Sequence, residues 1–154
     1  MHAKLSAGVI AAALAGSLAV ATPASATNIG QEGCTPGYWK NHTENWEEYS
    51  PSTSLGTVFS SLAGTPYENV TLLEALSLRG GPGVDGARQI LLRAATAATL
   101  NAAHEGLGYP YRRAHIPYNI IKKVNEAILS GDRQRMLDVA KTLDAANNLG
   151  CPLN

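Results

Sequence analysis

The sequence predicts an all-α domain, an irregular or orthogonal bundle of about four to five helices that is clipped by one disulfide. Three observations support this fold class. Apolar residues recur at helical spacing through the second half of the chain, and no segment shows a convincing alternation of apolar and polar residues. The only two cysteines, Cys34 and Cys151, lie near the two ends of the part that follows a predicted leader.

The first 26 residues have the order of features found in a secretory signal peptide. A basic start with His2 and Lys4 precedes an apolar, uncharged run, and Ala24-Ser25-Ala26 supplies the small residues that a signal peptidase accepts. We therefore expect residues 1–26 to be cleaved and residues 27–154 to form a single secreted, extracellular helical domain. An uncleaved leader that anchors the protein is the alternative.

The two cysteines are expected to form a disulfide with each other. Secreted proteins are oxidised, and Cys34 and Cys151 do not belong to a Cys-x-x-Cys pair of the kind found in metal and redox sites. For so long a loop, the chain-entropy model gives a stabilisation of roughly 4–5 kcal/mol.

The charge of the chain excludes some classes of partner. It has 12 basic and 12 acidic side chains, and loss of Lys4 with the leader leaves a small acidic excess. A dedicated nucleic-acid-binding domain has a basic surplus, and so does a surface that docks on anionic lipid. We expect no nucleic-acid partner, no membrane insertion after cleavage, and no cofactor.

The first half of the domain is predicted to be largely irregular. Pro36 and Gly37 occupy the middle positions of a turn over residues 34–37. Residues 50–54 are predicted to form a loop, and residues 55–62 a short helix or an extended piece.

The second half is predicted to contain the main helices. Their starting signals are a capping box formed by Thr71 and Glu74, N-caps at Asp85 and Asp132, and a proline, Pro117, in a first turn. Glycines follow most of the predicted ends. The predicted helices cover about residues 72–78, 86–104, 117–129 and 133–147.

Two terminal stretches carry a family resemblance. The first is Cys34-Thr35-Pro36-Gly37-Tyr38-Trp39-Lys40-Asn41-His42, and the second is Leu143-Asp144-Ala145-Ala146-Asn147-Asn148-Leu149-Gly150-Cys151-Pro152-Leu153-Asn154. They resemble the opening and closing motifs of a family of secreted microbial proteins and modules, and residues 92–95 and 100–104 are similar to its central helix. The resemblance spans essentially the whole mature chain. It implies a secreted domain and points to no established activity or site residues.

The densest cluster of aromatic and polar side chains is the leading candidate for a ligand site. Flat apolar faces beside hydrogen-bonding groups are typical of sites that bind sugars or cell-wall polymers. The alternative is that Trp39 and Trp46, seven residues apart and therefore on one helical face, fill the core beside the disulfide. The candidate ligand-binding residues are Tyr38, Trp39, Lys40, Asn41, His42 and Trp46.

Three histidines suggest a second, different chemistry. His42, His104 and His115, with Glu105 or Asp144, have the side chains that bind zinc or copper. Such a site would make the protein a small extracellular, metal-dependent enzyme. The spacing does not require one. His104-Glu105 begins like His-Glu-x-x-His but has Gly108 where the second histidine belongs, and a histidine is also favoured at a helix C-terminus without any metal.

A small basic patch offers a further contact surface. Arg112-Arg113 and Lys122-Lys123 stand near Tyr109, Tyr111 and Tyr118 in the sequence. These residues are suited to an anionic envelope polymer, and a simply solvated loop and helix face is the alternative.

The sequence as a whole favours a secreted, non-enzymatic binding or structural module. We expect it to bind cell-envelope carbohydrate or a surface protein through residues 38–46.

Overall fold

The computed structural model describes residues 30–115 and 118–153, and within these ranges the chain is helical with no strand. This confirms the predicted all-α fold with one disulfide, formed by Cys34 and Cys151. The helices are α1 (Pro36–Asn41), α2 (Leu55–Val58), α3 (Leu72–Ala75), α4 (Gly83–Ala103), α5 (Ile120–Ser130) and α6 (Arg133–Asn147), with short 3-10 helices at Thr43–Asn45 and Ser60–Leu62.

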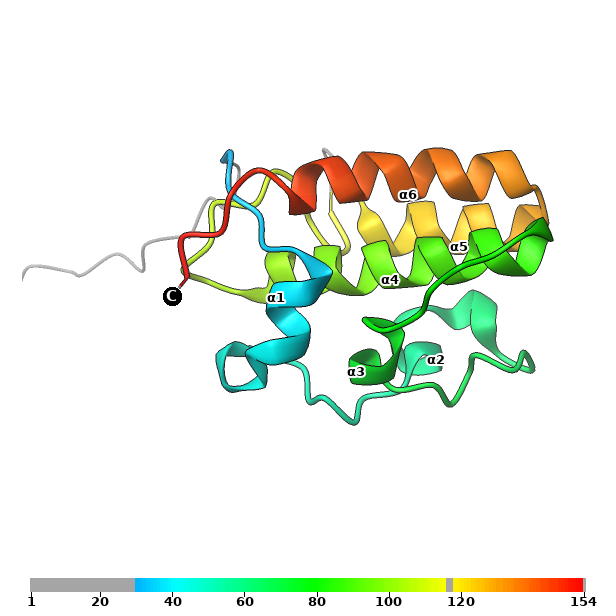
Figure 1. Ribbon diagram of the computed structural model, residues 1–154, viewed down its shortest axis with the longest axis horizontal. Coiled ribbons are helices and arrows are strands. Elements are labelled where there is room, and N and C mark those ends of the chain that lie inside the picture. The colour runs from blue at the N-terminus through cyan, green and yellow to red at the C-terminus, as the bar shows by residue number, and fades with distance from the viewer. Residues whose placement is uncertain (1–29, 116–117, 154) are drawn as a thin grey trace, which may run out of the picture.

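The three long helices pack against one another, and the short helices cover one side of α4. Figure 1 shows α4, α5 and α6 side by side, with α1, α2 and α3 gathered on the other side of α4. Helix α4 packs on α5, α6, α1 and α3, and it is therefore the centre of the molecule. Within residues 91–101 every residue except Arg93 is buried. Four of these buried residues are alanines, whose small side chains let the neighbouring helices approach closely.

The capping residues that the sequence predicts for two helices are confirmed. Thr71 and Glu74 form the predicted capping box, in which the Glu74 carboxylate accepts from the Thr71 N–H at 2.8 Å and the Thr71 hydroxyl accepts from the Glu74 N–H at 3.2 Å. Asp132 caps α6 by accepting from the Arg135 N–H at 2.6 Å. These signals are reliable because all their partners lie within one helical turn.

Two predicted boundaries at the beginning of the domain were wrong. The turn predicted over residues 34–37 is the start of α1, where Thr35 is the N-cap and its hydroxyl accepts from the Tyr38 N–H at 3.1 Å. Pro36 is the first helical residue, a position at which the missing proline N–H costs nothing. The helix predicted over residues 72–78 ends as α3 at Ala75.

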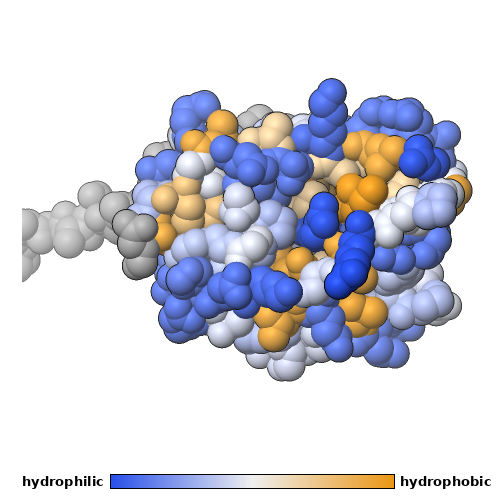
Figure 2. All heavy atoms as spheres, viewed as in Figure 1, coloured by the Kyte–Doolittle hydropathy of each residue, from blue (hydrophilic) through white to orange (hydrophobic). Residues whose placement is uncertain are grey.

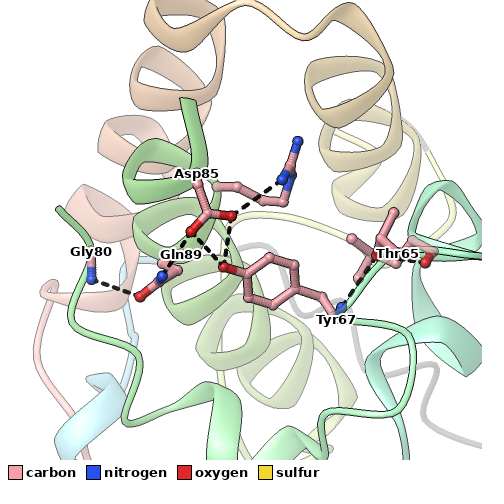
Figure 3. A network of polar contacts seen from close by, with 7 residues as sticks. Thr65, Tyr67, Gly80, Asp85 and Gln89 are labelled. Atoms are coloured by element: carbon pink, nitrogen blue, oxygen red, sulfur yellow. Dashed lines mark hydrogen bonds and ion pairs between the residues drawn. The ribbon is translucent and has the colours of Figure 1, made fainter. Parts of the chain in front are cut away.

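Asp85 is not the N-cap that the sequence predicts. Helix α4 begins two residues earlier, at Gly83, with Pro82 at the cap position. The Asp85 carboxylate instead accepts a hydrogen bond from the Tyr67 hydroxyl at 2.9 Å and one from the Gln89 amide at 3.1 Å (Figure 3). Its negative charge still lies in the first turn of α4, where the helix dipole favours it.

The start of α5 also differs from the prediction. Asn119 is the N-cap, and its side-chain oxygen accepts from the Lys122 N–H at 2.8 Å. Helix α5 therefore begins at Ile120, and Pro117, which the sequence places in its first turn, lies outside the described residues.

A buried asparagine joins the N-terminal segment to α4. The side-chain oxygen of Asn101 accepts from the Cys34 N–H at 2.8 Å and from the Trp39 indole N–H at 3.0 Å. Its amide nitrogen donates to the Cys34 carbonyl at 2.8 Å and to the Asn147 side-chain oxygen at 2.9 Å. Asn101 has no solvent exposure, yet each of its polar atoms is paired, as a buried amide requires.

Asn147 extends this network to the C-terminal segment. Its side-chain oxygen also accepts from the Tyr109 hydroxyl at 2.8 Å, and its amide donates to the Ala94 carbonyl at 3.0 Å. Asn147 is the last residue of α6 and is fully buried. We call Asn101, Asn147 and Tyr109 the buried polar hub.

The two chain ends meet beside this hub. The disulfide joins cysteines 117 residues apart, and the Gly33 N–H donates to the Gly150 carbonyl at 3.0 Å. Gly33 has to be glycine at this position, because a Cβ there would lie 2.0 Å from the Ala146 carbonyl oxygen.

We predict that Asn101→Ala lowers the free energy of unfolding by about 3 kcal/mol or more, since it leaves several buried donors and acceptors without partners. Urea denaturation of the disulfide-intact protein measures this. Asn148→Ala is the matched control, because Asn148 is exposed and its side chain donates only to the Asp144 carbonyl. It should change stability by less than about 0.5 kcal/mol. Equal effects of the two variants would contradict a structural role for the hub.

Candidate functional site

Trp39, the centre of the predicted ligand site, is a core residue. It has no exposed surface, and its indole N–H is bonded to Asn101 inside the protein. A ligand at the surface therefore cannot stack on its ring, and the core interpretation of Trp39 is the correct one. Trp46 is half-buried against the same core, and its indole N–H donates to the Trp39 carbonyl at 2.9 Å.

The polar groups around Trp39 are largely occupied by one another. The Tyr38 ring stacks on the His42 ring with centroids 4.4 Å apart, and the Tyr38 hydroxyl accepts from the Asn45 amide at 2.6 Å. The exposed Asn41 donates to the Gly37 carbonyl at 2.8 Å. Lys40 is exposed on the outer side of α1. Of the predicted ligand-binding residues, Lys40 and Asn41 are exposed, whereas Trp39 is fully buried.

The three histidines are not assembled into one site. The His42 Nδ1 lies 3.1 Å from the Glu44 carboxylate, whose pKa is lowered by a hydrogen bond from its own backbone N–H and by His42. The His104 Nε2 lies 3.5 Å from the Glu47 carboxylate. His115 is exposed in a different loop. Within residues 30–115 and 118–153, no three histidine, cysteine, aspartate or glutamate side chains form a group that could hold a metal ion.

A second region, which the sequence did not single out as a unit, is built from two loops. The first is the 47–49 turn (Glu47, Glu48 and Tyr49), and the second is the 104–115 loop that follows α4. The Glu47 carboxylate accepts from the Glu105 N–H at 2.6 Å, and the Glu48 carboxylate lies 2.6 Å from the Arg113 guanidinium. These contacts cross more than 55 residues of sequence and fix the two loops together.

The 47–49 turn is tight and strained. The Tyr49 N–H donates to the Glu47 carbonyl at 2.8 Å, which closes a three-residue turn around Glu48. Glu48 has φ of 61° and is the only described non-glycine residue with positive φ. A left-handed glutamate costs of order 1 kcal/mol, and such strain gathers at sites where the surrounding contacts hold it in place. Here the pairing of Glu48 with Arg113 supplies that restraint.

Between the two loops lies a cleft of about 310 Å³. Its size is at the lower end of the range for small-ligand sites. We call it the Tyr49 cleft. Residues from the 47–49 turn, α4, the 104–115 loop and α5 line it, namely Tyr49, Ala102, Tyr111, Arg112, Arg113, Ala114, His115 and Ile121.

Backbone hydrogen bonds hold the cationic wall of the Tyr49 cleft. The Arg112 N–H donates to the Tyr118 carbonyl and the Ile120 N–H donates to the Arg112 carbonyl, both at 3.0 Å, so that Arg112 pairs with Asn119 as an isolated parallel bridge. The Asn119 amide also donates to the Ala114 carbonyl at 2.8 Å. The position of Arg112 is therefore set by the start of α5.

The aromatic residues that line the cleft are Tyr49 and Tyr111, and Tyr111 is supported by two further tyrosines. The Tyr111 ring stacks on Tyr118 with centroids 4.4 Å apart and meets Tyr109 edge to face at 5.8 Å. Burial and the neighbouring phenols raise the pKa of Tyr109 and of Tyr118, so both remain protonated. Tyr109, which the sequence placed beside a surface patch, is fully buried and belongs to the hub.

Arg113 is already neutralised by its neighbours. Burial opposes its charged form, but hydrogen bonds to Tyr49 and Glu48 outweigh this, and the pKa of Arg113 is raised. The Tyr49 hydroxyl accepts from the guanidinium at 3.2 Å, and the guanidinium lies over the Tyr49 ring at 5.6 Å from its centroid. Arg113 thus closes one side of the cleft as a structural cation.

A second, smaller cavity of about 230 Å³ lies between α4 and α6, with Arg93, Lys141 and Asp144 at its polar side. The space-filling view shows a face on which small apolar patches are separated by hydrophilic side chains (Figure 2). The large apolar residues exposed in the described part are Val84, Leu129 and Leu149. They lie on different elements and do not indicate a single apolar docking surface.

Comparison with known proteins adds no relative. No protein-family model matches the chain, and no curated protein or solved structure matches it either. In the described residues, none of the helices has the length and apolar character needed to cross a membrane.

We predict that Trp39→Ala lowers the free energy of unfolding by about 3–5 kcal/mol, because it removes a fully buried indole and leaves Asn101 underbonded. Lys40→Ala, one position along α1, should change it by no more than about 0.5 kcal/mol. Chemical denaturation followed by far-ultraviolet circular dichroism measures both. A Trp39→Ala variant as stable as the unmodified protein would argue against its core role.

Proposed function

We propose that this protein is a secreted, non-enzymatic module that binds cell-envelope carbohydrate in the Tyr49 cleft. The observation that carries the proposal is the cleft itself, in which aromatic rings and cationic groups converge on one small concave surface. Ligand sites commonly combine apolar walls with a few placed polar groups in this way.

The chemistry of the cleft favours carbohydrate over the other expected partner, a surface protein. A sugar ring presents apolar C–H faces, which pack on tyrosine rings, and hydroxyl groups, which bond to phenol and guanidinium groups. Tyr49 and Tyr111 offer both kinds of contact. A protein partner needs a broad, well-packed interface of several hundred square ångströms on each side, whereas the cleft has room for a small unit such as one part of a polymer.

The proposed location outside the cell rests on the leader and the disulfide. Residues 1–26 have the features of a signal peptide, and the Cys34–Cys151 bond belongs to oxidising compartments. The resemblance of the terminal motifs to secreted microbial proteins agrees with this location.

The alternative, a metal-dependent enzyme that uses His42, His104 and His115, has no observation in its favour. Two of these histidines are beside different glutamates, and the third lies in the lining of the cleft. The contact of His42 with Glu44 is local, and that of His104 with Glu47 joins the end of α4 to the 47–49 turn, so we place the binding role on the cleft.

We predict that the disulfide-intact protein binds purified cell-envelope polysaccharide saturably, and that Tyr49→Ala weakens this binding by about tenfold or more through loss of an aromatic wall. Co-sedimentation at increasing polysaccharide concentration measures it. Tyr38→Ala is the control, since Tyr38 lies on α1 outside the cleft. A stronger loss with Tyr38→Ala would move the site to residues 38–46, and absence of saturable binding would overturn the proposal.

A further inference from the structure

We infer that the carbohydrate bound in the Tyr49 cleft is acidic, and that its anionic group pairs with the Arg112 guanidinium. This inference rests on the proposed function, because it names the class of sugar that the same cleft recognises. The proposed anionic group is a carboxylate or a phosphate on the saccharide. Both groups have two oxygens that can accept a pair of hydrogen bonds from one guanidinium.

The charges around the cleft leave one cation unbalanced. Arg113 is paired with Glu48 at 2.6 Å. Arg112 is half-buried in the lining, and its side chain makes no hydrogen bond or ion pair within the part of the chain that the structure describes. No aspartate or glutamate is among the described residues that line the cleft. A cation that lines a cleft without a counter-charge favours an anionic ligand, which would supply one.

The backbone presents Arg112 in a fixed position. Both its N–H and its carbonyl are used in hydrogen bonds to the segment that starts α5, at 3.0 Å each. Tyr111, the preceding residue, stacks on Tyr118 and meets Tyr109 edge to face. Because these contacts hold the backbone on both sides of Arg112, little backbone entropy is lost when a ligand binds. A single ion pair can then contribute more to the affinity.

The other cationic features of the surface do not offer the same arrangement. Lys122, part of the basic patch predicted from the sequence, lies 3.7 Å from Glu126 on its own helix. In the cavity between α4 and α6, Arg93 donates to the Leu78 carbonyl, and Asp144 is in the same lining as Lys141. Lys122 and Arg93 thus have oxygen partners, and Lys141 shares its cavity with an acidic side chain, whereas Arg112 lines a cleft without one.

Glu48 provides an independent way to change the charge of the cleft. Its carboxylate neutralises Arg113 without lining the cleft itself. In Glu48→Gln the side chain keeps its shape and a hydrogen-bond acceptor, while Arg113 loses its counter-charge. The cleft then gains one unbalanced positive charge, and an acidic sugar should bind more tightly.

The experiment is a calorimetric titration of the full disulfide-intact protein with three probes of known structure: trigalacturonate, galactose 1-phosphate and the neutral galactotriose. We expect the unmodified protein to bind at least one acidic probe about tenfold more tightly than galactotriose, a preference that weakens as salt is added. Preference for trigalacturonate indicates a carboxylate ligand, and preference for galactose 1-phosphate indicates a phosphate.

Single-residue variants test which side chains cause the preference for acidic probes. Arg112→Ala should remove the preference and leave galactotriose binding unchanged, and Arg112→Lys should keep part of it. Glu48→Gln should increase it severalfold. Lys141→Ala, which removes a cation from the other cavity, is the matched control and should leave it unaltered. Thermal melting of each variant establishes that it is folded.

The outcomes separate this inference from the proposed function. Equal binding of acidic and neutral probes would overturn the inference while the carbohydrate-binding function stands. An acidic preference that survives in folded Arg112→Ala would overturn the assignment to Arg112. Failure of all three probes, together with failure of the envelope polysaccharide to bind, would overturn the proposed function as well.

Discussion

The rest of the structure depends on the hydrogen bonds that the buried Asn101 side chain makes. One buried amide binds both backbone groups of Cys34 and the indole of Trp39, and it passes a hydrogen bond to Asn147. Each buried polar group left unpaired costs about 1–3 kcal/mol, so an alternative packing of these elements would lose several bonds at once. The amide therefore selects one arrangement of the N-terminal segment on α4 in a way that non-directional apolar packing of an alanine-rich helix cannot.

This contact gives the two terminal motifs a common physical role. The opening motif contributes Cys34 and Trp39, and the closing motif contributes Asn147 and Cys151, so both meet at the hub and at the disulfide. Many polar groups of the two motifs form hydrogen bonds inside the protein. Trp39, the centre of the ligand site that the sequence predicts, therefore serves to stabilise the fold. A dense polar and aromatic motif is thus as consistent with a structural junction as with a binding site.

What the sequence predicts and what it misses follow from the range of each interaction. The capping box at Thr71 and the cap at Asp132 were predicted because donor and acceptor lie within four residues. The N-cap prediction for Asp85 was wrong because α4 begins two residues earlier, and the Asp85 carboxylate accepts from Tyr67, 18 residues away in the sequence. The Tyr49 cleft was missed as a unit because Glu48 and Arg113 are far apart in the chain, and only the fold brings them together. The arginines themselves were noticed, but nothing local shows which of them is already paired.

The hub and the cleft are in contact, and this bears on the proposed binding role of the cleft. Tyr109 links the two, since its hydroxyl donates to Asn147 while its ring meets Tyr111, which lines the cleft, edge to face. On α4, Ala102 of the cleft lining directly follows Asn101. The lining of the cleft is therefore held next to the buried polar hub by contacts that form on folding, and a pre-positioned surface loses less conformational entropy when a ligand binds. Selectivity in the proposed site would come from fixed charge and shape, and Arg112, whose side chain has no partner among the described residues, is the group to which we assign it.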